Sequence, residues 1–402
     1  MPHFDLPAIQ SALAQFDLDA WLLADFRGSN PLAATVLGLD PAAHRTRRWL
    51  YVIPRQGTPK KLVHRIEPAA LAGLPGDERI YLTWQDFQAG VAWTLVDLPS
   101  DLGQPRVALE YSPRNMIPYI SRIDGGLLEL VRDCGVEPVS SGNLLQEFEA
   151  TWTPEQWQLH LQAAQGTNAA YDRVWRFLRE AAASGHEPRE TDVQDLIMNH
   201  FAEHGLITDH PPIVGVGPHA GDPHYAPMRG ADSAIRAGDL VLVDLWAKVD
   251  HPRGVYSDLT RMGYMGQQVP EKYAAVFAIV AAARDAAIAL VTTRFDTGQQ
   301  LAGWEVDQAA RQVIVDAGYG AAFVHRTGHN IGTSTHGNGA NMDNLETRDE
   351  RRVLRRTCFS VEPGIYLPEF GIRSEVNVYV DKDGQVHVTG GDLQRQIVPI
   401  LA

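Results

Sequence analysis

The sequence is poor in cysteine and in positive charge. Its two cysteines, Cys134 and Cys358, are too far apart in the sequence to form a metal knuckle, so we expect reduced thiols that pack in the interior. Aspartate and glutamate outnumber lysine and arginine by 49 to 35, and the net charge of −14 argues against nucleic acid or an anionic membrane as a partner. This balance fits a soluble cytoplasmic protein, although charge alone identifies no substrate.

Targeting segments and repeats are also missing from the sequence. The first residues contain no basic segment followed by an apolar core, so we expect no signal peptide. No apolar stretch approaches the ~20 residues that a membrane span needs, so we expect no membrane partner. We find no internal repeat and no low-complexity tract.

The length of 402 residues predicts two or three domains. Within residues 1–150, short apolar runs near 19–24, 49–53 and 106–110 indicate strands, and the segments between them, such as residues 113–133, allow helices. This part contains no ligand cluster and no glycine-rich phosphate loop. We therefore predict a small α/β domain here.

The domain boundary is predicted near Thr153, which can cap a helix that has Pro154 at its first position. Residues 151–402 then form the second domain. In it we expect a long helix from Pro154, a second helix at 190–204, strands at 212–216 and 240–247, and helices at 270–293 and 303–317, followed mainly by strands and loops.

Two aspartates follow apolar sequence in the second domain. Asp244 ends the run Leu240–Val243, and a lone carboxylate in a buried strand is costly without a partner. Asp258 follows the turn-rich segment 250–254, and a hairpin there could bring both carboxylates onto one surface. A capped strand end or a buried salt bridge remains an alternative interpretation of each aspartate.

Histidines gather in two glycine-containing segments. His325, His329 and His336 are separated by glycines that allow a close approach of the backbone, which suits one metal ligand and two substrate contacts. His219 and His224 lie in a Pro- and Gly-rich loop that suits a pocket wall. A surface loop, a core histidine or an ordinary turn explains each segment equally well.

Glutamates complete a candidate ligand set. Glu362 ends a strand before a Pro–Gly turn, and Arg373 and Glu375 are two apart on a predicted strand, so they share a face. That pair is either an exposed ion pair or a metal-bound glutamate oriented by an arginine. Together with Asp244, Asp258 and His329, the two glutamates form an oxygen-rich set suited to two divalent ions and to hydrolysis.

The order and local context of these residues resemble the pita-bread metallopeptidases, in particular the branch of Xaa-Pro dipeptidases (prolidases) and aminopeptidase P. The resemblance covers about residues 155–402 and includes the step from His329 to His336. It implies an α+β fold with a pita-bread catalytic domain at 151–402. Residues 1–150 resemble, more loosely, the smaller α/β creatinase-type N-terminal domain.

The resemblance also implies a role for each metal ligand. Asp244 would chelate one metal ion, Asp258 and Glu375 would bridge the two ions, and His329 and Glu362 would complete the other. Glu362 would also accept the proton of the attacking water.

Further residues match positions of the family around the substrate. His224 and His336 would bind substrate and stabilise the oxyanion, and His325 would be a further substrate-site histidine. Tyr366 and Arg373 match supporting positions.

The activity implied is hydrolysis of the bond before proline by two divalent ions, most of all in dipeptides. Manganese is the ion expected by resemblance, and the oxygen-rich set also permits cobalt or zinc. Family members are commonly homodimers. The alternatives are an aminopeptidase P acting on longer peptides and a catalytically silent pita-bread domain that binds peptides or proteins; the intact ligand set argues against a creatinase-like hydrolase, which works without it.

The sequence departs from the family pattern beside the first aspartate. Trp246 stands where the family usually has glycine, and Val249 stands where it often has tyrosine. The connection between Asp244 and Asp258 is also longer than usual. We expect these differences to change the shape of the pocket next to the metals.

Overall fold

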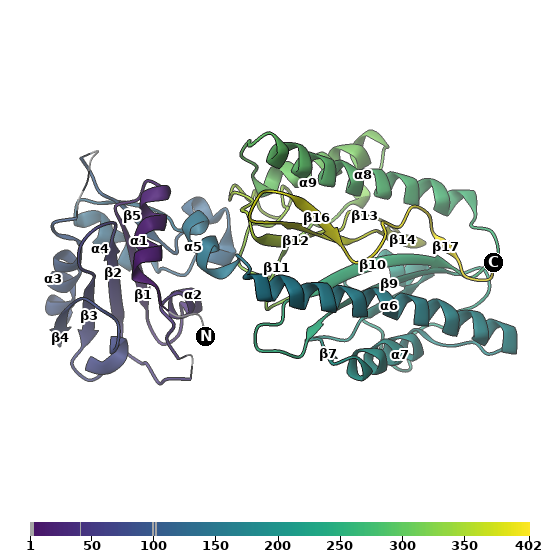
Figure 1. The fold of residues 1–402 in the computed structure, drawn as a ribbon, viewed down its shortest axis with the longest axis horizontal. Helices are drawn as coiled ribbons and strands as arrows, with labels where there is room; N and C mark the ends of the chain where they lie inside the picture. The colour runs from purple at the N-terminus through teal and green to yellow at the C-terminus, as the bar shows by residue number, and fades with distance from the viewer. Residues whose placement is uncertain (1–3, 41, 99, 101–102) are drawn as a thin grey trace. The chain divides into compact units, whose positions relative to one another are not determined.

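The computed structural model describes residues 4–40, 42–98, 100 and 103–402. The chain folds into two compact units, Met1–Glu149 and Ala150–Ala402 (Figure 1). Both cysteines are free, and Cys358 is buried, as expected from the sequence.

The first unit is built on a six-stranded mixed sheet with the strand order β4-β3-β2-β1-β5-β6. Its strands are β1 (Ala20–Asp25), β2 (Trp49–Pro54), β3 (Lys60–His64), β4 (Asp77–Tyr81), β5 (Arg106–Leu109) and β6 (Glu137–Ser140). Its helices are α1 (Leu6–Gln15), α2 (Pro31–Val36), α3 (Trp84–Leu95), α4 (Gly125–Asp133) and α5 (Gly142–Glu149), with short 3-10 turns η1 (Pro68–Leu71), η2 (Pro113–Asn115) and η3 (Pro118–Ile120).

Both faces of this sheet are buried at its centre, along β1 and β2. Along β1, Trp21 and Leu23 contribute to one core, whereas Leu22 and Ala24 contribute to a second core on the opposite face. The predicted strands near 19–24, 49–53 and 106–110 are confirmed as β1, β2 and β5. Strands β3, β4 and β6 were not predicted.

The second unit contains three sheets and four long helices. The helices are α6 (Pro154–Ser184), α7 (Glu190–Glu203), α8 (Glu271–Asp296) and α9 (Gly303–Asp316). One sheet has the order β17-β10-β9-β7, with β8 also paired to β9; the second has the order β11-β12-β15-β16; β13 and β14 form a hairpin. The bounds are β7 (Leu206–Ile207), β8 (Ile213–Val216), β9 (Leu240–Val249), β10 (Ser257–Tyr264), β11 (Asn330–Ile331), β12 (Thr357–Val361), β13 (Gly364–Leu367), β14 (Phe370–Arg373), β15 (Val376–Val380), β16 (Val386–Thr389) and β17 (Val398–Pro399), with the 3-10 turns η4 (Gly217–Gly221) and η5 (Gly320–Ala322).

Helix α6 begins where its capping sequence predicts. The Thr153 hydroxyl accepts a hydrogen bond from the Gln156 backbone N–H, and the Gln156 side chain accepts one in return from the Thr153 N–H. Gly185, with φ of 72°, ends the helix in the left-handed conformation that glycine adopts readily. The predicted helices of this unit are confirmed as α6, α7, α8 and α9.

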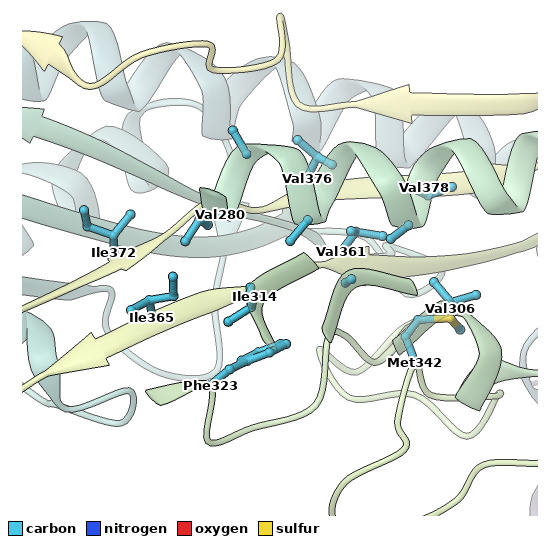
Figure 2. Close-up of a cluster of buried hydrophobic side chains, with 14 of the residues drawn as sticks. Val280, Val306, Ile314, Phe323, Met342, Val361, Ile365, Ile372, Val376 and Val378 are labelled. Atoms are coloured by element: carbon cyan, nitrogen blue, oxygen red, sulfur yellow. The ribbon is translucent and has the colours of Figure 1, made fainter. Parts of the chain in front are cut away.

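Helices cover the β9–β10 sheet on two sides (Figure 1). Val241 and Val243 of β9 pack with α6 and α7, whereas Leu240 and Leu242 belong to the core that also contains side chains of α8 and α9. Figure 2 shows part of the core that α8 and α9 share with Leu240 and Leu242, including Val280 of α8 and Val376 of β15. Because side chains alternate along a strand, Asp244 lies on the face that Leu240 and Leu242 share.

Helix α8 corrects one expectation. It is long and apolar enough, by length and composition, to cross a membrane, so the statement that no stretch approaches that length is wrong. Its side chains Phe277, Val280 and Ala283 are buried in the core of the unit, and the charged Arg284 is fully buried at its middle. This burial accounts for the apolar composition of a core helix.

Candidate metal centre

The pairing register of one β-hairpin brings Asp244 and Asp258 onto the same face. Strands β9 and β10 are antiparallel, with Asp244 opposite Thr260 and Trp246 opposite Asp258. Residues opposite each other, and residues two apart, point to the same face of a sheet, so both carboxylates lie on one side. Both are buried. The predicted hairpin is confirmed, and Asp244 lies in the middle of β9, which excludes the alternative of a capped strand end.

His329 and Glu362 approach from the second sheet. His329 precedes β11 and Glu362 follows β12, in the two-residue step that leads to β13. The imidazole Nε2 lies 3.4 Å from Asp258 Oδ2 and 3.5 Å from Glu362 Oε1. The Ser360 hydroxyl holds both residues, because it accepts from the His329 backbone N–H and donates to Glu362 Oε1, each over 3.0 Å.

Arg373 and Glu375 do not share a continuous strand, which corrects the prediction. Strand β14 ends at Arg373 and β15 begins at Val376, so Glu375 lies in the break between them. The two side chains nevertheless meet at Thr260 of β10. Arg373 Nε donates to the Thr260 hydroxyl over 3.0 Å, and this hydroxyl donates to Glu375 Oε2 over 2.8 Å.

Three of the five predicted ligands form a compact cluster that could hold a metal ion. One ligand atom from each of Asp258, His329 and Glu375 lies within 4.8 Å of the others, and all three residues are buried. Asp244 is tied to the same cluster by Arg373, whose Nη2 donates to Asp244 Oδ2 over 2.5 Å. Among the described residues, the second oxygen, Asp244 Oδ1, is buried without a hydrogen-bond partner.

The four carboxylates of the candidate ligand set carry more negative charge than the positive charge beside them balances. Burial raises the pKa of Asp244 to about 6 and that of Asp258 to about 7, and it also raises the pKa of Glu362 and Glu375, although Arg373 opposes each shift. Buried charges need a partner. An unpartnered oxygen, an oxygen-rich donor set and this excess of negative charge together fit divalent cations.

His325, Tyr366 and Arg373 form a hydrogen-bonded chain. Arg373 Nη1 donates to the Tyr366 hydroxyl over 2.8 Å, and this hydroxyl lies 2.7 Å from His325 Nε2. His325 Nδ1 lies 2.6 Å from the Arg326 carbonyl, which only accepts, so Nδ1 carries a proton. Burial lowers the pKa of His325 to about 3, and the neutral ring then accepts from Tyr366.

His336 and His224 lie at the exposed rim of this cluster. The His336 ring stands edge-on to that of His329, with 4.2 Å between ring centroids. His224 follows η4 in a loop that Arg373 approaches, with Nη1 3.5 Å from the Pro223 carbonyl. The structure thus brings both near the cluster. His219, by contrast, binds the buried Glu190 over 2.9 Å, which favours a structural role.

Several residues of the site were not predicted from the sequence. Thr260 and Ser360 connect the candidate ligands, and each lies two positions from one of them, Thr260 from Asp258 on β10 and Ser360 from Glu362. That spacing is the signal that could have identified them. Asp209, which contacts Trp246 and Thr335 beside the cluster, has no such local signal.

Comparison with known proteins decides the family. Residues 158–382 match Metallopeptidase family M24. The chain belongs to this family. Probable dipeptidase PepE of Mycobacterium tuberculosis is 31% identical over 278 residues, which are 68% of each chain. A Lactobacillus helveticus protein named Xaa-Pro dipeptidase is 30% identical over 253 residues, or 62% of each chain.

Solved structures share the fold of this M24 metallopeptidase. Dipeptidase PepE from Mycobacterium ulcerans superposes with a TM-score of 0.66 at 24% identity and covers 99% of both chains. An X-prolyl aminopeptidase from Caenorhabditis elegans, described as having a di-nuclear active site, has a TM-score of 0.61 at 16% identity over 99% of this chain and 64% of its own. The predicted α+β class, the pita-bread catalytic domain and the assignment as a metallopeptidase are confirmed.

Proposed function

We propose that this M24 metallopeptidase hydrolyses the peptide bond before proline, most of all in dipeptides, and that its site holds two divalent ions. The observation that carries the proposal is the cluster around Asp258, His329 and Glu375, together with the unpartnered oxygen of Asp244. Relatives named Xaa-Pro dipeptidase support the substrate. Manganese is the proposed ion, with cobalt and zinc as alternatives.

The five ligands divide between two positions in this proposal. Asp244 would hold one ion, His329 and Glu362 would hold the other, and Asp258 and Glu375 would bind both. Bound ions would lower the pKa of a water molecule and polarise the scissile carbonyl. Arg373 fixes one oxygen of Asp244 and leaves the other for a metal ion.

Glu362 is the proposed proton acceptor and donor. Burial raises the pKa of its carboxyl, which suits a group that takes a proton from water and returns it to the proline nitrogen. The Ser360 hydroxyl holds one of its oxygens in place. His336 and His224, at the rim, would bind substrate and stabilise the oxyanion.

His325 has a more limited role than the sequence suggests. Both of its ring nitrogens are engaged, one with Arg326 and the other with Tyr366. It can contact substrate only by exchanging one of these bonds. We therefore propose that it mainly orients Tyr366 and, through it, Arg373.

Substitution of Glu362 tests the proposal. Glu362→Ala should lower the rate of proline release from Ala-Pro by at least about 100-fold, because the variant loses a ligand and the proton acceptor. The same substitution at exposed Glu369, in the β13–β14 hairpin, is the matched control and should keep full activity. Full activity of Glu362→Ala would contradict the assignment.

The substrate range separates the alternatives. Faster cleavage of Ala-Pro-Ala than of Ala-Pro would favour an aminopeptidase P. Absence of hydrolysis with manganese, cobalt or zinc would favour a silent binding domain. The cytoplasmic location and the homodimer stay predictions.

A further inference from the structure

Trp246 lies beside the metal ligands and holds a carboxylate of another segment. It is two residues from Asp244 on β9 and opposite Asp258 on β10, so its side chain leaves the sheet on the ligand face. Its indole Nε1 donates to Asp209 Oδ1 over 2.7 Å. Asp209 belongs to the connection between β7 and β8, so this contact fixes a loop residue to the central hairpin.

Asp209 stands at the rim of the cluster. Thr335, the neighbour of His336 in the sequence, places its hydroxyl 3.4 Å from each Asp209 oxygen. Trp246, the other donor to Asp209, stands opposite the ligand Asp258, so Asp209 lies between the neighbours of a ligand and of a rim histidine. The side chain is 44% exposed, so a substrate can reach it.

The Trp246 and Thr335 donors do not neutralise the negative charge of Asp209. Trp246 and Thr335 are neutral donors, and the described ion-pair contact is His210, whose Nδ1 lies 3.5 Å away on a side chain that is 76% exposed. Lys248, the nearby lysine, donates to the Thr333 carbonyl instead. Burial raises the pKa of Asp209, but the bonds from Trp246 and His210 outweigh it, so the pKa is lowered and the group is a carboxylate.

We propose that Asp209 binds the ammonium group at the amino end of the dipeptide and that Trp246 is its positioning residue. This inference rests on the proposed function. In a dipeptide the ammonium nitrogen is only about 2.5 Å from the scissile carbonyl carbon, so its partner must stand directly beside the metal ligands. Asp209 meets that requirement, and a charge-assisted bond to ammonium would favour substrates with a free amino end.

Asp209→Asn tests the charge while it keeps the shape and an acceptor for the Trp246 indole. We expect KM for Ala-Pro to rise about tenfold or more, with kcat changed by less than about threefold, because the bond is made in both the ground state and the transition state. N-acetyl-Ala-Pro, which lacks the ammonium group, should be a poor substrate of the wild type and equally poor for the variant.

Trp246→Phe tests the positioning role. It removes the indole N–H but keeps an aromatic ring, so KM for Ala-Pro should rise in the same direction by a smaller factor. In the double variant the two effects should not multiply, because both act on one bond. Asp250→Asn, at an exposed aspartate just after β9, and Trp84→Phe, at an exposed tryptophan of the first unit, are matched controls and should leave KM unchanged.

The outcomes separate this inference from the proposed function. A wild type that cleaves no Xaa-Pro dipeptide would overturn the proposed function itself. An active wild type whose KM for Ala-Pro is unchanged by Asp209→Asn would overturn the inference alone. A rise in KM confined to Lys-Pro would also overturn it, since Asp209 would then recognise a side-chain ammonium. If Asp209→Asn does not fold, weaker inhibition of the wild type by N-acetylalaninamide than by alaninamide supports the inference, and equal inhibition overturns it.

Discussion

At the scale of single residues, local context indicated the candidate ligands, whereas their connectors Thr260 and Ser360 are marked only by a two-residue spacing. Asp244, His329 and Glu362 each stand next to an apolar run, a glycine or a Pro–Gly turn, and those signals lie within a few positions. Thr260 connects Arg373 and Glu375, which lie more than a hundred positions away along the chain. Asp209 likewise meets Trp246 only after folding, so no local pattern could have predicted their bond.

The buried aspartates make stability depend on pH. Their pKa values of about 6 and about 7 exceed the ordinary value near 4. Between about pH 4 and 7, folded chains stripped of divalent ions by a chelator hold protons that unfolded chains have released, so the free energy of unfolding falls as pH rises through this window. Bound cations remove this penalty, because they favour the deprotonated carboxylates.

Thermal unfolding at several pH values measures this effect. The difference in Tm between manganese-loaded and chelator-treated protein should widen from pH 5 to pH 7.5. In Asp258→Asn the chelator-treated protein should lose less stability over the same range, since one titrating group is gone. A gap in Tm that does not change with pH would contradict the assignment of these groups.

At the scale of elements, predictions succeeded where periodicity was long and failed where strands were short. The helical patterns of α6, α7, α8 and α9 extend over many turns, so their existence was clear. Strand β4 is largely exposed and β6 contains Pro138, so neither shows an apolar run. The break between β14 and β15 was also missed, because Glu375 is fixed by its bond with Thr260 rather than by strand pairing.

Helix α8 supports that break through one buried side chain. Arg284 Nη1 donates to the Ser374 hydroxyl over 2.7 Å and to the Gln394 carbonyl over 2.9 Å. Ser374 separates Arg373 from Glu375, so Arg284 anchors the segment that carries a proposed metal ligand. The guanidinium also binds Asp285.

Arg284→Met should lower the free energy of unfolding by about 2–4 kcal/mol, because it leaves a buried hydroxyl and a carbonyl without their donor. Arg395→Met is the matched control: Arg395 binds the same Asp285 but is exposed, so its loss should cost less than about 1 kcal/mol. Urea unfolding of both variants compares the two values. Equal losses would show that the Ser374 and Gln394 contacts contribute little.

At the scale of the whole molecule, the candidate metal centre lies within one of two units. The first unit has its own two cores, and the second carries the candidate metal ligands, Arg373 and the rim histidines. The length alone predicted two or three domains. The assembly of the site could not be read from any single segment, since its ligands come from two sheets and the connections between them.

The central claim is that bound divalent ions in this cluster hydrolyse the bond before proline. Its most direct test is proline release from Ala-Pro by chelator-treated protein, measured together with bound manganese as manganese is added back. We predict no release from the stripped protein and a rate that rises with bound metal to a plateau at two ions per chain. Release that persists after stripping, or none at full occupancy, would contradict the account.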